Sequence, residues 1–227
     1  MMVRIVVLLG VFLAGLLPTA SSSAGLMLEF AVGGAPQTAI GIAGPGQWVD
    51  IQVHLRQTGP LALGEPDLQI DGLALAGVRV SFGNPVGIAE VSLIKENPAF
   101  DDGAAVKFID LVGSVAELNE GVSDIFGGPF VTADANGRIL LGTFRFTGLA
   151  AGVTSISVEE FSTFPGDDDF FTGTFTALDD FGIAPGTATL TVTPEPGTMG
   201  LSFALLGAIV AGRRYRARRR RDASVPS

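Results

Sequence analysis

The chain of 227 residues contains no cysteine and only one histidine, His54. Without cysteine, neither a disulfide framework nor a thiolate metal site is available. With one imidazole, a histidine-based zinc site is excluded, and any nucleophile that needs a histidine base would have to use His54. No G-x-S-x-G elbow and no phosphate-binding glycine motif is present. We therefore expect no enzyme, and we expect His54 to lie at the surface, on the polar side of a strand.

Positive charge is scarce in most of the chain. Between residues 25 and 196 there are six basic and twenty-two acidic side chains, which gives a net charge of −16, against −9 for all 227 residues. Binding of nucleic acid requires lysine and arginine clustered on one face of a protein. A nucleic-acid partner is therefore disfavoured.

Arginine is concentrated instead near the C-terminus, directly after an uncharged apolar run. Residues 197–212 carry no charged side chain and approach the length that crosses a bilayer, at about 1.5 Å per residue. A buried core helix is the alternative for such a run, but the basic cluster at 213–221 argues against it. By the positive-inside rule, seven arginines form a stop-transfer signal that stays in the cytoplasm: Arg213, Arg214, Arg216, Arg218, Arg219, Arg220 and Arg221.

The tripeptide Pro194, Glu195 and Pro196 stands directly before this apolar run. The order of motif, apolar helix and terminal basic cluster over residues 194–221 resembles the PEP-CTERM sorting signal of exported bacterial proteins. The resemblance implies that a membrane-embedded exosortase binds and cleaves the signal. It also implies export through the inner membrane, a membrane-anchored precursor, and a final place at the cell surface or in the extracellular matrix.

The N-terminus carries a matching export signal. Residues 1–24 contain one positive charge at Arg4, an apolar stretch at 5–17, and small residues that end at Ala24. This order is typical of a signal peptide cleaved after Ala24. Residues 25–193 then remain as one exported domain, which is long enough to bury a core of its own.

The periodicity of this domain is that of β-strands. Residues 48–56 alternate, with Val49, Ile51, Val53 and Leu55 on the core side. About nine strands separated by turn signals predict an all-β fold, an antiparallel β-sandwich flanked by the signal helix and the transmembrane helix. The expected strands lie at 26–32, 48–56, 78–82, 86–94, 104–110, 138–147, 153–161, 170–178 and 187–193.

Several local features of these strands can be predicted as well. Alternation places Leu140, Phe144 and Phe146 together on the core side of strand 138–147. Asn136-Gly137 suits a type I′ hairpin turn, because both residues tolerate positive φ. Residues 114–119 favour a helical turn.

The order of strands also resembles the cohesin-like β-sandwich, a jelly-roll fold. The resemblance rests on the strands at 47–55 and 75–82 and on the glycine-initiated strand at 137–146. It implies a binding module that docks another protein module on one sheet face. A polysaccharide of the matrix is the other ligand we consider, with Trp48 either stacking on a sugar or capping the edge of the core.

Acidic residues in two loops could supply oxygen ligands to calcium, which is the one metal that the sequence leaves open. Asp134 and Asn136 lie in one loop, and Asp167, Asp168 and Asp169 lie in another. Neither loop has the spacing of an EF-hand, and solvated loop acids are the alternative interpretation.

An extracellular hydrolase acting on polysaccharide is the alternative function. Glu159 and Glu160 are adjacent on a strand and point to opposite faces, so they cannot flank one glycosidic bond. Such an enzyme would need carboxylates from distant loops at catalytic separation, with perturbed pKa values. The sequence therefore favours a non-enzymatic, membrane-tethered and then exosortase-processed surface or matrix protein, whose sandwich binds a protein or a polysaccharide.

Overall fold

The computed structural model describes residues 25–59, 64–84, 87–101, 105–125, 128–161 and 170–195. The signal peptide, Asp167 to Asp169, Pro196, the apolar run and the arginine cluster lie outside the described residues. Within the described part, no helix is both long and apolar enough to cross a membrane.

Thirteen strands and one short 3₁₀ helix make up the described part of the chain. The elements are β1 (Gly25–Val32), β2 (Ala35–Pro36), β3 (Ala39–Ile42), β4 (Trp48–Thr58), β5 (Leu73–Asn84), β6 (Ala89–Glu96), β7 (Val106–Asp110), β8 (Val115–Gly121), β9 (Arg138–Gly148), β10 (Gly152–Glu160), β11 (Phe170–Thr172), η1 (Asp179–Phe181), β12 (Ile183–Ala184) and β13 (Gly186–Val192). Nine of the strands correspond to predicted ones, although β11 is much shorter than expected; β2, β3, β8 and β12 were not predicted.

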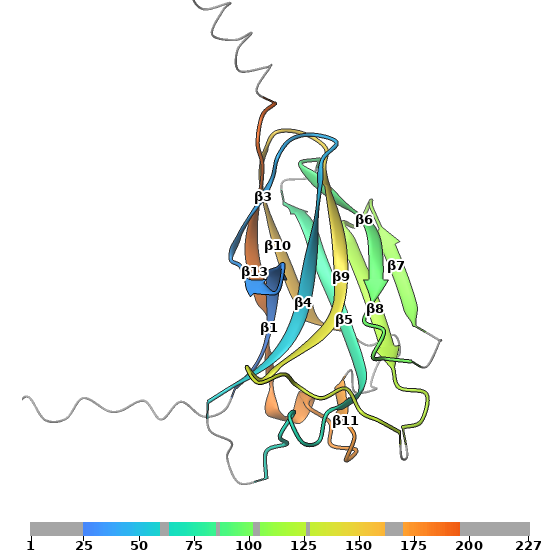
Figure 1. Ribbon diagram of the computed structural model, residues 1–227. Helices are drawn as coiled ribbons and strands as arrows, with labels where there is room; N and C mark the ends of the chain where they lie inside the picture. The colour runs from blue at the N-terminus through green and yellow to red at the C-terminus, as the bar shows by residue number, and fades with distance from the viewer. Residues whose placement is uncertain are drawn as a thin grey trace, which may run out of the picture.

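The strands form two sheets that pack face to face (Figure 1). Sheet A has the order β12-β1-β4-β9-β6, with β2 beside β1, and sheet B has the order β3-β13-β10-β5-β8-β7, with β11 beside β5. The predicted all-β sandwich is therefore confirmed. Pairing is antiparallel except at β1–β12 and β3–β13, where strands from the two ends of the domain run side by side in parallel.

The core lies between the sheets and follows the alternation of the sequence. Ile51, Val53 and Leu55 of β4 are fully buried. Ala188, Leu190 and Val192 of β13 are buried too, as are Val78, Val80 and Phe82 of β5. Phe82 meets Phe146 edge to face across the core, with ring centroids 5.9 Å apart. Burying each such aromatic side chain contributes about 1.5–3 kcal/mol.

Leu140 does not face the core, so this part of the prediction is wrong. The register between β4 and β9 shifts next to His54. Ile139 and Leu141 are buried on the core side instead, and Leu140 pairs with His54 on the outer side of sheet A. A β-bulge adds one residue and reverses the alternation, which a simple period of two cannot anticipate.

The helical turn predicted at 114–119 is also wrong, because these residues enter strand β8. Ala116 and Leu118 face the core, while Glu117 and Asn119 pair on the outer side. β8 is hydrogen-bonded to β5 on one side and to β7 on the other. Two paired neighbours outweigh the helix propensity of Ala, Glu and Leu.

The turn at Asn136-Gly137 forms, but it is not type I′. Gly137 has a φ of 71°, whereas Asn136 does not adopt a positive φ, and type I′ requires positive φ at both central residues. The carboxylate of Asp134 accepts hydrogen bonds from the amides of Asn136 (2.8 Å) and Arg138 (3.0 Å). These bonds fix an Asx-type turn in place of the predicted one.

Candidate functional site

The outer face of sheet B carries a row of side chains that crosses four strands. Phe108 of β7 pairs with Glu117 of β8, Glu117 pairs with Arg79 of β5, and Arg79 pairs with Glu159 of β10. Directly opposed residues of antiparallel strands share one face, so the four side chains lie side by side. Together with Val106 and Phe161 we call them the Arg79 face.

Arg79 is held in place from three directions. Its Nε donates to Glu117 Oε1 at 2.8 Å, and its Nη1 lies 3.9 Å from Glu159 Oε1. The guanidinium carbon lies 4.1 Å from the centroid of the Phe161 ring, in a cation–π contact. Because these contacts fix the side chain, a partner would meet an ordered charge and would lose little additional entropy on binding.

The apolar part of the Arg79 face is exposed. Val106 and Phe108 remain 50% and 51% exposed, on the same side of β7 as their partners Asn119 and Glu117. Further along sheet B, the small polar residues Ser155, Thr187 and Thr189 are exposed. The alternation of Val106 and Phe108 is visible in the sequence, but which side of the strand meets solvent depends on the pairing with β8.

On the outer face of sheet A, a turn of the chain itself is attached to the strands. The Gly33-Gly34 turn is tied to it by two hydrogen bonds: the Gly34 amide donates to Gln52 Oε1 (2.9 Å), and Arg138 Nη1 donates to the Gly34 carbonyl (2.7 Å). Glu29 and His54 pair across β1 and β4 in this region, and each is 8% exposed.

His54 is therefore buried, and its predicted place at the surface is wrong. Burial, with a smaller contribution from the positive charge of Arg138 and against the attraction of Asp134, lowers the pKa of His54 to about 4. A neutral imidazole at physiological pH follows. Alternation correctly put His54 on the outer side of the sheet, but the strand pattern did not reveal what covers it.

Buried polar atoms without a hydrogen-bond partner concentrate in the same place. In the described part of the chain, six of the seven such side-chain atoms belong to Glu29, His54, Arg56 and Arg138. Arg138 Nε lies 2.5 Å from Glu29 Oε1 and Arg56 Nη1 lies 3.6 Å from Glu29 Oε2, so charge pairing holds the cluster without well-aligned hydrogen bonds.

Trp48 lies on the outer side of sheet A and is 55% exposed, so it does not cap the core. The guanidinium of Arg145 covers one side of its ring, 3.7 Å from the centroid. Arg145 also forms two hydrogen bonds with Asp50, of 2.7 and 3.0 Å, and Lys95 adds a third of 3.0 Å. The Arg145 hydrogen bonds are the main reason that the pKa of Asp50 falls to about 2.

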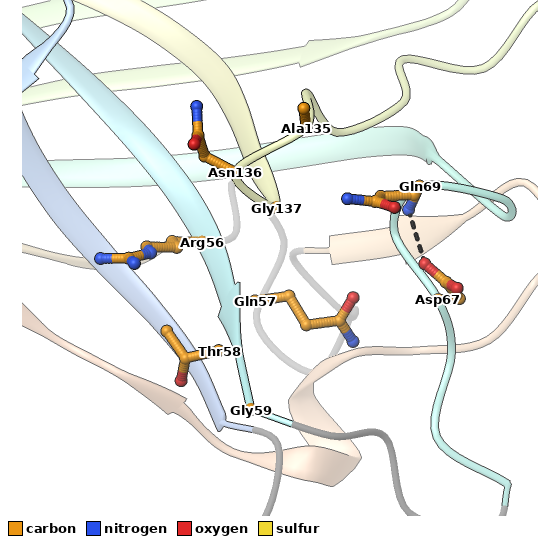
Figure 2. Close-up of a pocket in the computed structure, with 9 residues that line it drawn as sticks. All are labelled: Arg56, Gln57, Thr58, Gly59, Asp67, Gln69, Ala135, Asn136 and Gly137. Atoms are coloured by element: carbon orange, nitrogen blue, oxygen red, sulfur yellow. Dashed lines mark hydrogen bonds between the residues drawn. The ribbon is translucent and has the colours of Figure 1, made fainter.

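A polar pocket of about 400 Å³ opens at the lower end of the sandwich (Figure 2). Its polar groups are largely occupied by contacts within the protein. Gln57 binds the carbonyl of Pro66 and the amide of Leu68, and the Asp67 carboxylate accepts the amide of Gln69, the bond drawn in the figure. The lining residues are Arg56, Gln57, Thr58, Gly59, Asp67, Gln69, Ala135, Asn136 and Gly137.

In the first predicted calcium loop, the Asp134 carboxylate stabilises a turn of the backbone. Asp134 Oδ1 accepts the two amides of its own turn, and these bonds outweigh desolvation, the largest single influence, so that the pKa of Asp134 is lowered. Among the described residues, no three acidic or histidine side chains gather where they could hold a metal ion. The second loop, Asp167 to Asp169, lies outside the described residues.

The sorting motif is described only in part. Pro194 and Glu195 follow β13 after Thr193 and are exposed. Glu117 and Glu159 are two carboxylates on one face, but the guanidinium of Arg79 lies between them and interacts with both. A glycosidic bond would have to occupy the space that this side chain fills.

Comparison with known proteins finds similarity of fold to cohesins. A type I cohesin–dockerin complex from Clostridium thermocellum matches with 11% identity over 72% of this chain and 99% of that chain, at a TM-score of 0.46. A type II cohesin domain from the cellulosome of Acetivibrio cellulolyticus matches with 10% identity over 73% and 95%, at 0.46. A type I cohesin from Pseudobacteroides cellulosolvens matches with 10% identity over 76% and 96%, at 0.44.

At these identities the similarity concerns the fold alone. No protein-family model matches the sequence, and no curated protein is similar to it.

Proposed function

We propose that the chain is an exported, membrane-tethered binding module whose β-sandwich docks a protein partner on the Arg79 face. The observation that carries this proposal is the row in which Glu117 lies between exposed Phe108 and an arginine, Arg79, that is fixed by Glu117, Glu159 and Phe161. Aromatic residues and arginine are enriched in protein interfaces and supply most of their binding hot spots.

A protein suits this face better than a polysaccharide does. Sugar recognition favours an open aromatic ring, and the one tryptophan of the chain has a guanidinium against its ring. The Arg79 face is a sheet surface that spans four strands. A surface of this width suits a protein partner, because standard protein interfaces bury about 800 Å² on each partner.

The charges on this face indicate the chemistry of the partner. Two carboxylates, Glu117 and Glu159, share one cation, so the row has an excess of negative charge. We expect the partner to bring an apolar side chain against Phe108 and Val106 and a basic group toward Glu159. Opposite charge at the rim accelerates association and fixes orientation more than it adds affinity.

Binding is tested with the exported protein immobilised and exposed to envelope and extracellular fractions of cells that carry its export machinery. Quantitative mass spectrometry should identify a protein retained by the unaltered chain and lost with Phe108→Glu. Replacing an exposed aromatic anchor should weaken binding roughly tenfold or more. Ile70→Glu is the matched control, because Ile70 is 77% exposed but lies outside the Arg79 face. Equal retention by both variants would refute the Arg79 face as the docking site.

Processing at the sorting motif is the second part of the proposal. Its support is the resemblance of residues 194–221 to the PEP-CTERM signal, together with the exposure of Pro194 and Glu195 after the last strand. An exosortase would cleave near this motif and release the sandwich from its anchor to the surface or matrix. Mass spectrometry of the mature C-terminus tests this step: residues 213–227 still present on the exported protein, with an exosortase in the cell, would contradict it.

A further inference from the structure

The end of the sandwich from which β13 leaves (Figure 1) is built largely from uncharged segments, beside which Glu90 pairs with Thr147 and Arg145 lies over the ring of Trp48. We define this exit end as residues 43–48, 147–153 and 191–194. All of them are uncharged, in a domain whose net charge is strongly negative. The opposite end, around the pocket of Figure 2, contains Asp67 and Asp134 with other acidic loop residues. The three segments of the exit end thus carry no charge of their own, whereas the pocket end carries several carboxylates.

Hydrogen bonds join the three segments of the exit end. The amide of Gly46 donates to the carbonyl of Gly148 (2.8 Å), and the amide of Gly148 donates to the carbonyl of Gln47 (2.9 Å). Thr193 is bonded to the carbonyls of Ile42 and Ala43 through its amide and hydroxyl, at 3.0 and 2.6 Å. The last strand and the neighbouring loops therefore form one ordered surface.

Apolar side chains project from this surface. Trp48, Leu149 and Val153 are 55%, 46% and 53% exposed. They lie at the same end because Trp48 pairs with Thr147, two residues before Leu149, and Val153 pairs with Thr191. Tryptophan favours the boundary between lipid and water, where its ring is in an apolar layer and its N–H remains hydrated.

The distance to the apolar run keeps this end near a membrane. Glu195 packs beside the exit end, since a Cβ on Gly44 would be 3.6 Å from its Cγ. Met199, where the strongly apolar residues begin, follows four residues later, so a fully extended chain spans at most about 14 Å between them. A tether of this length gives the exit end a high effective concentration at the lipid surface.

We propose that the exit end rests on the lipid bilayer in the membrane-tethered precursor, with Trp48, Leu149 and Val153 in the interfacial layer. This inference rests on the C-terminal tether of the proposed function. The uncharged segments then meet the membrane, and the acidic pocket end points away from it. The sorting motif is held at the membrane surface, within reach of a membrane-embedded protease, and the Arg79 face stays open at the side.

The single tryptophan of the chain makes a direct test practical. Residues 25–227 are reconstituted in phosphatidylcholine vesicles, with and without a spin label at the headgroup or at a shallow acyl position. We expect the protein to float with the vesicles and Trp48 emission to fall roughly twofold with the shallow labels, as for an interfacial tryptophan. The double variant Leu149→Glu, Val153→Glu should float but lose this quenching.

Ile70→Glu is again the matched control, because it adds a charge at an exposed apolar position of the opposite end; its quenching should equal that of the unaltered chain. Circular dichroism checks that each variant is folded. Flotation without quenching overturns the inference and leaves the tether intact. Equal quenching of the double variant also overturns it, because the apolar side chains would then not determine the contact. If the protein does not float with the vesicles, the C-terminal membrane tether is refuted, and the inference that rests on it is refuted as well.

Discussion

His54 makes the stability of the sandwich depend on pH in a range where no other side chain of ordinary pKa titrates, because it is the only histidine. Its pKa falls from 6.5 to about 4 in the folded protein, mainly through burial and secondarily through Arg138. Below pH 6.5 the unfolded chain therefore binds a proton at His54, whereas the folded protein does not bind it until the pH approaches 4. The stabilisation is complete above pH 6.5 and is lost as the pH falls toward 4.

The magnitude follows from the size of this shift. One pKa unit corresponds to about 1.4 kcal/mol, so the whole shift is worth about 3 kcal/mol, of which about 2 kcal/mol is lost between pH 7 and pH 5. For a domain with a typical stability of about 5–15 kcal/mol this is a large share. Carboxylates begin to contribute only below pH 5, which leaves the upper range to His54.

Urea unfolding of residues 25–195 at pH 7, 6 and 5, followed by circular dichroism, measures this loss. The variant His54→Gln cannot bind the proton, so its unfolding free energy should stay constant over the same range even if the variant is less stable throughout. A flat profile for the unaltered protein would refute the argument. An equal dependence of the unfolding free energy on pH in His54→Gln would also refute it, because the proton would then bind to another residue.

Two further substitutions test backbone and surface contacts by urea unfolding. Gly137→Ala should lower the free energy of unfolding more than Gly34→Ala does. Both positions have positive φ (71° and 83°), but only at Gly137 would the new Cβ lie 2.7 Å from the Gln57 carbonyl oxygen, whereas Gly34 has open space. The strain alone costs about 1–2 kcal/mol, and equal losses would show that the Gln57 contact relaxes. Arg145→Lys should lose about 0.5–1 kcal/mol, since it ends the paired hydrogen bonds to Asp50 at a partly exposed site. An unchanged midpoint would contradict that assignment.

The sandwich could be predicted because its core follows a simple alternation. In β4 the predicted inward residues Ile51, Val53 and Leu55 are buried, and Val49 packs against the core. The prediction was wrong where pairing partners matter more than local pattern. Leu140 faces outward because a bulge lies beside it, and residues 115–121 form a strand because two neighbours accept their hydrogen bonds. Neither a bulge nor a neighbour is encoded in the periodicity of one segment.

The candidate site was harder to predict, since it combines residues from four strands. Phe108 and Glu159 are 51 positions apart in the sequence, and only the register of β7, β8, β5 and β10 places them in one row. His54 illustrates the same limit of prediction from local sequence. Its direction followed from alternation, but its burial arises among residues from other strands, since Glu29 of β1 and Leu140 of β9 pair with it on either side.

The distribution of cations connects the composition of the domain with its surface. Each of the six basic side chains of residues 25–193 is paired with a carboxylate of the same domain. Four of them cross the outer face of sheet A, where Glu29 and Asp50 each bind two: Arg56, Arg138, Lys95 and Arg145. Positive charge is thus used within the fold, and the unpaired charge that the domain presents to its surroundings is negative. A partner that is attracted by long-range electrostatics must then be basic. Glu117 and Glu159, which share Arg79, give the row on sheet B that contains Phe108 an excess of negative charge.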